Sequence, residues 1–379
     1  MGGSIRDMLC GRRPTDYDVA VLGDALEFAR RVEINTNGRL VKIGKPGRMI
    51  LRVIGKSNSI DISETKEGSI EQNLRARDFT INAMAYELSS RQLIDPLAGQ
   101  HDLKNRTIRM ASEAVFSQDP IRLLRAFRLA AAFQFEIEPQ TTKAIKRQAA
   151  LIRHSAKERV REEFFKLLQC PKVHPYLGLM VDTGVLFYIF PELLELKHCS
   201  QNRYHQLNAF EHTLNAFYHL EELLETNFKR LQIKNQSIVP QIDAKQVYLL
   251  KFSMLLHDIG KPVVQTMDEK GVFHFKDHER QGAKMAKDIC KRLKCSNRDA
   301  DSIYFMVRHH MRPLFLFTAL QKHNATRKAV TRNEFGLKPS HLFKKILNRV
   351  ETERLSRSDM TRQEAVDLVR DLIQDEKSN

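Results

Sequence analysis

The stretch that decides the fold opens the chain: Gly2-Gly3-Ser4-Ile5-Arg6-Asp7, followed nine residues after Asp7 by Asp16-Tyr17-Asp18-Val19-Ala20-Val21. In an extended strand the side-chain period is two, so Asp16 and Asp18 point to the same side. Two carboxylates held together on a rigid strand can bind a divalent metal such as Mg²⁺. The pattern predicts a phosphoryl-transfer site with Asp16 and Asp18 as its catalytic metal pair, and a plain strand-edge turn is the alternative interpretation.

The glycine pair supports the metal-site interpretation. Gly2 and Gly3 allow backbone amides to approach phosphate oxygens closely, and Arg6 follows within reach as a cationic partner. No Gly-Lys-Ser/Thr follows, so the segment is not a P-loop. We therefore expect Gly2, Gly3 and Arg6 to bind the phosphates of a nucleotide.

Three further segments belong to the same pattern. They are Arg77-Asp78-Phe79-Thr80-Ile81-Asn82-Ala83, then Asp95-Pro96-Leu97 with Gly99 and Asp102-Leu103, then Gln118-Asp119-Pro120 through Arg122, Arg125 and Ala126. With the glycine turn and the Asp-x-Asp pair, they resemble, in the same order, the motifs of the class II tRNA nucleotidyltransferase and bacterial poly(A) polymerase family. Five collinear elements over about 125 residues are a specific signature.

The resemblance implies a metal-dependent nucleotidyltransferase that adds C and/or A nucleotides to the 3′ end of tRNA, as CCA addition or repair. CTP and ATP are the implied substrates, Mg²⁺ is the implied cofactor, and no nucleic-acid template is needed. It also implies that Arg77, Asp78 and Asn82 bind the ribose of the nucleotide. Asn82 lies one turn beyond Asp78 and faces the same way. The alternative is that Asp78 caps a helix that begins at Phe79.

In the family, the positions of Asp119 and Arg122 select the incoming base. A carboxylate and a guanidinium together offer an acceptor and donors to the Watson–Crick edges of cytosine and adenine. The alternative interpretation of Asp119 is a helix cap. Gln118 stands where the family usually has Glu, and a neutral amide holds a guanidinium less firmly. Arg125 and Arg128 continue the basic stripe, and we expect them to reach the triphosphate or RNA.

The composition indicates a polyanionic partner, which the resemblance identifies with tRNA. The 379 residues include 62 Lys plus Arg against 46 Asp plus Glu, a net charge of +16 at pH 7. Between Lys143 and Lys166 there are eight Lys or Arg and only three acids. A solvated helix face is the plain interpretation of such a run. The expected RNA-binding residues are Lys143, Lys146, Arg147, Arg153 and Arg159.

A second constellation lies in the C-terminal half. It comprises His212, His257-Asp258-Ile259-Gly260-Lys261-Pro262, His278 and His309-His310. Imidazole and carboxylate ligands suit a transition metal. The Leu-His-Asp-Ile-Gly-Lys-Pro segment resembles the HD phosphohydrolase domain, which implies His212, His257, Asp258 and His278 as metal ligands. The late Asp with which that family closes its site is not found, so metal binding is expected rather than hydrolysis.

The expected fold class is α+β. We predict a small mixed-sheet nucleotidyltransferase head over residues 1–110 and an all-helical neck for nucleotide selection and RNA binding over 111–200. A helical HD-type metal domain over 201–332 and a helical tail over 333–379 complete the prediction. Within the head we expect a helix over Asp24–Val32 and strands over Arg39–Ile43, Met49–Ile54 and Ser59–Ile62, with Asp61 as a candidate third carboxylate.

Three alternatives stay open. Two are within the family: a bacterial poly(A) polymerase, and an enzyme that adds only CC or only A. The third is of another class, an HD-domain phosphohydrolase with a degenerate nucleotide-binding front domain, and the intact Asp16-x-Asp18 argues against it. Beside the family, a strand before Gly2 and helices after Arg332 are expected and not found. Five cysteines without a Cys-x-x-Cys pair and no apolar membrane span predict a cytoplasmic protein.

Overall fold

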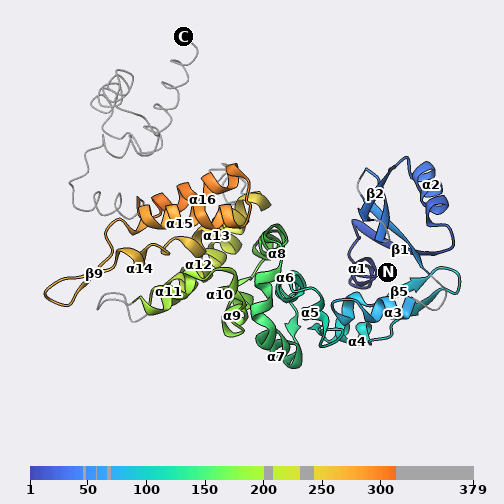
Figure 1. Ribbon diagram of the computed structural model, residues 1–379, viewed down its shortest axis with the longest axis horizontal. Helices are drawn as coiled ribbons and strands as arrows, with labels where there is room; N and C mark the ends of the chain where they lie inside the picture. The colour runs from blue at the N-terminus through green and yellow to red at the C-terminus, as the bar shows by residue number, and fades with distance from the viewer. Residues whose placement is uncertain (46–47, 57, 66–69, 200–207, 231–242, 313–379) are drawn as a thin grey trace, which may run out of the picture. The chain divides into compact units, whose positions relative to one another are not determined.

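The computed structural model describes residues 1–45, 48–56, 58–65, 70–199, 208–230 and 243–312 (Figure 1). The chain divides into two compact units, Met1–Arg308 and His309–Asn379. Almost everything described here belongs to the first unit. The predicted helical tail and the segment around Arg332 lie outside the described residues. No helix within the described residues is long and apolar enough to span a membrane.

The N-terminal part holds a four-stranded mixed sheet, as predicted (Figure 1). Its first strand runs parallel to the last one, and the remaining neighbours pair antiparallel. In spatial order the strands are β1 (Asp16–Leu22), β4 (Ser59–Thr65), β3 (Arg48–Ile54) and β2 (Arg39–Lys45). Each predicted strand is confirmed, with ends displaced by up to three residues.

Alternation along the strands separates the two faces of this sheet. Leu51, Val53 and Ile62 are buried against helix α2 (Ala25–Thr36), which runs four residues beyond the predicted end. Asp24 caps this helix by accepting the N–H groups of the second and third helical residues. Because Leu51 pairs with Ile62, the next pair along, Arg52 with Asp61, points to the opposite face. That face also carries the Asp-x-Asp pair.

Helix α1 (Gly3–Leu9) lies beside strand β1, and the glycine before it makes this possible. Gly2 has φ +74°, a conformation that L side chains rarely adopt. A Cβ atom on Gly2 would lie 3.0 Å from Asp18 Oδ2. The glycine therefore lets the backbone approach the carboxylate pair, as the sequence pattern indicated.

Between the sheet and the helical body the chain forms short elements. They are α3 (Ile70–Arg75), a 3₁₀ turn η1 (Thr80–Asn82), β5 (Ala85–Glu87), β6 (Gln92–Ile94), α4 (Gly99–Lys104) and β7 (Thr107–Ile108). The alternative that a helix begins after Asp78 is therefore wrong, because only one 3₁₀ turn forms before the chain enters the β5–β6 hairpin.

The remainder is mainly helical. The helices are α5 (Val115–Gln118), α6 (Ile121–Phe133), α7 (Pro139–Gln148), η2 (Ala149–His154), α8 (Lys157–Gln169), α9 (His174–Asp182), α10 (Val185–Ile189), α11 (Glu192–His198), α12 (Ala209–Arg230), α13 (Ala244–Leu256), α14 (Lys261–Val264), α15 (His278–Arg292) and α16 (Asn297–His309). Aromatic rings join their core: Phe164 lies 4.9 Å from Phe190 and 5.8 Å from Phe252, centroid to centroid.

Three details differ from the sequence expectation. The neck is not entirely helical, because β8 (Glu136–Ile137) pairs with β7. The HD region also contains a hairpin, β9 (Thr266–Met267) with β10 (Phe273–His274). The polar composition of Asn227–Ala244 predicts a loop, but its first residues, 227–230, continue helix α12, and residues 231–242 lie outside the described residues.

A buried ion pair ties the neck to the following helices. Lys251 of α13 donates to Glu221 of α12 at 2.6 Å and to the carbonyl of Cys170 at 2.7 Å. Glu221 in turn accepts the backbone N–H groups of Val173 and His174 at 2.8 and 2.7 Å. Each of the two buried charges thus has at least two hydrogen bonds, which lowers the cost of burying it.

Candidate active site

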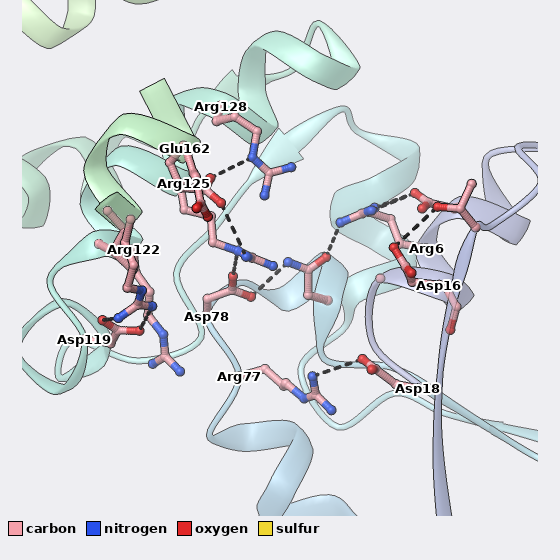
Figure 2. Close-up of a pocket in the computed structure, with 18 residues that line it drawn as sticks. Arg6, Asp16, Asp18, Arg77, Asp78, Asp119, Arg122, Arg125, Arg128 and Glu162 are labelled. Carbon is pink, nitrogen blue, oxygen red and sulfur yellow. Dashed lines mark hydrogen bonds and ion pairs between the residues drawn. The ribbon is translucent and has the colours of Figure 1, made fainter. Parts of the chain in front are cut away.

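A cavity of about 530 Å³ opens where the sheet, helix α1 and helices α6 and α8 meet (Figure 2). Its lining is almost entirely polar and charged. The lining residues are Gly3, Ser4, Arg6, Asp7, Thr15, Asp16, Asp18, Arg77, Asp78, Asn82, Asp119, Ile121, Arg122, Arg125, Arg128, Arg159, Glu162 and Glu163. In Figure 2 the Asp16/Asp18 pair lies at one end and Asp119/Arg122 at the other, with Asp78 and Arg125 between them. The structure thus brings together residues from four of the five motif segments, and the Asp95–Leu103 segment contributes none to the lining.

The first end of the cavity carries the predicted metal pair. Asp16 Oδ1 accepts a hydrogen bond of 2.5 Å from the Ser59 hydroxyl, and Asp18 Oδ2 lies 3.5 Å from Arg77 Nη1. The Asp18 side chain is 38% exposed, so its oxygens are accessible from the cavity. Two accessible carboxylates on one face of a strand are hard oxygen ligands, and this donor set fits Mg²⁺.

The candidate third carboxylate has a different partner. Asp61 lies in register with Asp18 on the neighbouring strand, but both of its oxygens accept 2.6 Å hydrogen bonds from Arg52. The hydrogen bond to Asp61 raises the pKa of Arg52. Asp61 is therefore already neutralised by a bidentate pair, and its contacts do not support the third-ligand interpretation.

Arg6 connects the glycine turn to the cavity centre. Its guanidinium lies 2.7 Å from Asp7 Oδ1, donates to Asn82 Oδ1 at 2.5 Å, and stacks 4.6 Å from the Phe133 ring centroid. Burial lowers its pKa, partly offset by Asp7. The guanidinium therefore lines the cavity from a fixed position and also holds Asn82 in place.

The centre of the cavity is an ion-pair network around Asp78. This buried carboxylate accepts from the Phe79 N–H and from Asn82 Nδ2, both at 2.9 Å, and lies 2.5 Å from Arg125 Nε. Burial alone would raise the pKa of Asp78, but Arg125 and these hydrogen bonds outweigh it and hold the pKa below its usual value. The predicted proximity of Asp78 and Asn82 is confirmed. Arg128 Nε extends the network by donating to Glu163 at 2.9 Å.

The far end of the cavity holds the predicted base-selecting residues. Asp119 does not cap helix α6, so its helix-cap interpretation is wrong. Instead its two oxygens accept hydrogen bonds from the two terminal nitrogens of Arg159, at 3.0 and 2.8 Å. Among the described residues, the acceptors for Arg122 are neutral oxygens, those of Val115, Gln118 and Ala76, each at 3.4 Å.

The predicted RNA-binding run is divided between two places. Arg159 lies in the cavity and belongs to the Asp119 pair. The other members lie on α7 and η2, outside the cavity lining: Lys143, Lys146, Arg147 and Arg153. Arg147 contacts Glu113 at 3.4 Å, and the Arg153 guanidinium stacks 4.5 Å from the Tyr188 ring centroid. Lys146, Arg147 and Arg153 are solvent-exposed, as a phosphate-binding surface requires.

The second constellation assembles around Asp258, at the junction of α13 and α14. Asp258 Oδ2 lies 3.1 Å from His257 Nε2 and 3.7 Å from His212 Nε2, while Oδ1 lies 3.4 Å from His278 Nε2. Ligand atoms of His212, His257 and Asp258 all lie within 4.8 Å of one another. Gly260 permits this convergence, because a Cβ there would clash with the His278 carbonyl oxygen.

Hydrogen bonds also orient two of these imidazoles. Nδ1 of His257 lies 2.7 Å from the Met254 carbonyl oxygen, and Nδ1 of His278 lies 2.8 Å from that of Phe275. When a carbonyl accepts the Nδ1–H of a neutral imidazole, the Nε2 lone pair is available to a metal, as in metal-ligating histidines. Lys261 Nζ lies 2.7 Å from Asp258 Oδ2, and it shares this carboxylate with the imidazoles. The donor set fits a transition metal.

Sequence reasoning missed several cavity residues. Asp7, Glu162 and Glu163 line the cavity but are not among the predicted site residues. Glu163 follows Arg159 by four residues on α8, so both side chains lie on one helix face. That spacing was the available signal that α8 contributes a second wall to the cavity.

Comparisons with known proteins agree with this geometry. Residues 61–109 match the poly A polymerase head domain, residues 134–197 the probable RNA and SrmB-binding site of polymerase A, and residues 209–334 the HD domain. The chain is 34% identical to an A-adding tRNA nucleotidyltransferase of Deinococcus radiodurans over 82% of this chain and 68% of that one. It is 31% identical, with the same coverage, to a CC-adding tRNA nucleotidyltransferase of Thermus thermophilus.

Solved structures show the same fold. One is a tRNA nucleotidyltransferase complexed with a primer tRNA and an incoming ATP analog, with TM-score 0.64, 21% identity, and coverage of 94% of this chain and 95% of that one. Another is a tRNA-processing enzyme with CTP, with TM-score 0.64, 20% identity, and coverage of 100% and 93%. The fold and the cavity define a nucleotidyltransferase. The chain belongs to the tRNA nucleotidyltransferase and poly(A) polymerase family.

Proposed function

We propose that this chain adds C and/or A nucleotides to the 3′ end of tRNA, from CTP and ATP, in the cavity between the sheet and helices α6 and α8. The observation that carries the proposal is the joining of a metal-ligand pair and a base-selecting pair in one cavity. Its relatives include A-adding, CC-adding and multifunctional CCA proteins. Its proposed compartment is the cytoplasm, which agrees with five free cysteines and a tRNA substrate.

The reaction forms one P–O bond and breaks another. The terminal 3′-hydroxyl of the tRNA attacks the α-phosphorus, and pyrophosphate leaves. Asp16 and Asp18 would hold Mg²⁺, which when bound neutralises triphosphate charge and lowers the pKa of the attacking hydroxyl. Arg77 stands beside Asp18 and can meet the phosphates together with the α1 amides. Asp78, fixed by Asn82 and Arg125, is positioned to accept from the ribose.

Base choice is assigned to the opposite end. Cytosine and adenine both present an exocyclic amine next to a ring nitrogen acceptor, whereas uracil and guanine present a carbonyl next to an N–H. Asp119 can accept from the amine, and Arg122 can donate to the ring nitrogen. The tRNA itself would be held through Lys143, Lys146, Arg147 and Arg153, which lie within the segment that matches an RNA-binding family.

We assign the His212, His257, Asp258 and His278 cluster a separate function, binding of a transition metal. The oriented Nε2 atoms support this assignment. A phosphomonoester or a 2′,3′-cyclic phosphate is the corresponding hydrolytic substrate class, since a bound metal would polarise the phosphoryl group. The cluster is the specific observation that favours this second candidate activity.

One experiment tests the main proposal. Each reaction contains the protein, Mg²⁺, one tRNA substrate and one nucleoside triphosphate. The tRNA lacks its CCA end, ends in C or ends in CC, and the lengths of the products are measured. We expect extension by CTP, ATP or both, limited to one to three nucleotides. Long adenosine tracts would instead identify a poly(A) polymerase, and absence of any extension would contradict the proposal.

A further inference from the structure

The two residues assigned to base choice are held very differently. Asp119 accepts two hydrogen bonds from Arg159 of α8, of 3.0 and 2.8 Å, one at each carboxylate oxygen. The partners are 40 residues apart in sequence, and the helices that bring them together, α6 and α8, pack directly against each other. Arg122 has three contacts of 3.4 Å, all to neutral oxygens.

The bidentate contact with Arg159 fixes the direction in which Asp119 can accept a hydrogen bond from a base. Each carboxylate oxygen has two lone pairs, so a fork that uses one on each oxygen leaves one on each for another donor. The planar guanidinium also fixes the plane of the carboxylate, which a single point charge does not. The free lone pairs of Asp119 thereby acquire a defined direction in the cavity that both residues line. A fixed acceptor favours the amine of cytosine or adenine over the carbonyl oxygen of uracil or guanine.

Gln118, the neighbour of Arg122, explains why Asp119 is the more firmly oriented of the two base-reading residues. Gln118 offers Arg122 an amide oxygen at 3.4 Å rather than a carboxylate. A neutral acceptor orients a guanidinium less firmly than an ionised one. Of the two base-reading side chains, only Asp119 is therefore held by a charge-assisted pair, and its direction depends on helix α8.

We propose that Arg159 is a positioning residue for nucleotide selection, which acts through Asp119 rather than by gripping RNA phosphates. The inference rests on the proposed function of the cavity. It removes Arg159 from the RNA-binding run Lys143 to Lys166 and makes α8 part of the base-reading wall. Arg159 is 53% exposed, so replacing it leaves the helical core intact.

The test compares Arg159→Lys and Arg159→Ala with Arg153→Lys and Arg153→Ala, a matched pair from the same run that lies outside the cavity lining. Two quantities are measured: the ratio of kcat/KM for CTP or ATP to that for UTP or GTP, and the tRNA Kd. We expect both Arg159 variants to lower the discrimination ratio about tenfold, because lysine keeps the charge but loses the fork. Their tRNA Kd should change less than about twofold. The Arg153 variants should show the reverse, with Kd raised and the ratio unchanged.

A double-mutant cycle completes the test. Asp119→Ala combined with Arg159→Ala should discriminate no worse than Asp119→Ala alone, because Arg159 acts only through that carboxylate. Additive losses would overturn the inference, as would a Lys variant with wild-type discrimination or a raised tRNA Kd that matches Arg153→Ala. Sharper discrimination in Arg159→Ala would overturn it too, since the pair would then compete with the base. If wild-type protein extends no tRNA, the proposed function itself fails, and this result is distinct from all of the above.

Discussion

The cavity around Asp16 and Asp18 and the cluster around Asp258 are both built from carboxylates and cations, but they are built for opposite conditions. Asp18 is 38% exposed and lies 3.5 Å from Arg77, whereas the Asp258 side chain is 2% exposed and lies 2.7 Å from Lys261. A site that must admit a triphosphate and an RNA end needs open carboxylates. A closed cluster with oriented imidazoles needs only an ion.

The difference also shows which charges are already neutralised. In and beside the cavity, three carboxylates each lie 2.8 Å or less from an arginine: Asp61, Asp78 and Asp119. Asp18 lies 3.5 Å from Arg77, and Asp16 accepts from the hydroxyl groups of Thr15 and Ser59. Of these five carboxylates, the two with the weakest contacts to a cation are thus the two predicted to hold Mg²⁺. The pairing of the other acidic residues with arginines reduces the repulsion between these carboxylates and a bound triphosphate. The two regions are separable sites on one chain, and the following experiments test that separation.

The largest effect is expected from the metal pair. Asp16→Ala or Asp18→Ala should lower incorporation of both CMP and AMP by at least about 1,000-fold, because lost metal binding removes charge stabilisation from the transition state. tRNA affinity, the melting temperature and the metal content of the Asp258 cluster should stay as in wild type. Turnover near the wild-type rate in either folded variant would refute the assignment.

Base selection should respond by a smaller factor. Asp119→Ala and Arg122→Ala should each reduce discrimination between cognate and non-cognate nucleotides by roughly 5- to 150-fold, the equivalent of about 1–3 kcal/mol per base contact. Single-nucleotide incorporation with CTP, ATP, UTP and GTP measures the ratio. The matched control is Arg153→Ala, in which discrimination should be unchanged. Intact selectivity in both cavity variants would remove these residues from base reading.

The basic run should govern tRNA binding alone. Reversing Lys146, Arg147 and Arg153 to Glu should weaken tRNA binding about tenfold or more and flatten the slope of log K against log salt by roughly 2–3, since each lost phosphate contact removes less than one unit. Fluorescence anisotropy at several salt concentrations measures both. An unchanged slope would show that these side chains form a solvated helix face and that the tRNA lies elsewhere.

The sequence predicted the local parts of both sites and missed the long-range pairings. The strand with Asp16 and Asp18 was predictable because a period of two needs only adjacent residues. The Asp78–Arg125 pair joins residues 47 positions apart, from the segment before η1 and from α6. The Asp119–Arg159 pair joins residues 40 positions apart, and its formation depends on how α6 packs on α8. For the same reason Arg159 was grouped with its neighbours in sequence rather than with its partner in space.

The alternative interpretation of Asp78, as the cap of a helix that begins at Phe79, shows a different limit. Residues 79–86 have a helical spacing of apolar side chains, but Phe79 forms a bridge with Met110 and β5 pairs with β6. Tertiary pairing therefore overrides the local pattern. The prediction still placed Asp78 and Asn82 correctly, because one 3₁₀ turn is enough to bring the two side chains together.

The smallest expected effect on nucleotide addition comes from the Asp258 cluster, and it tests the separation most directly. His257→Ala should empty the transition-metal site and leave CMP and AMP addition within about twofold of wild type, because the ligands of the two sites belong to different elements. His257 is buried, so His212→Ala, whose side chain is 36% exposed, serves as a second variant less prone to misfold. Elemental analysis of the purified and metal-loaded proteins measures the site, and the single-nucleotide assay measures addition. If wild-type protein takes up no transition metal, the cluster is a hydrogen-bonded structural group held by Lys261. If a folded His212→Ala variant loses nucleotide addition, the two sites are coupled, and the contrast between an open catalytic cavity and an independent closed cluster no longer holds.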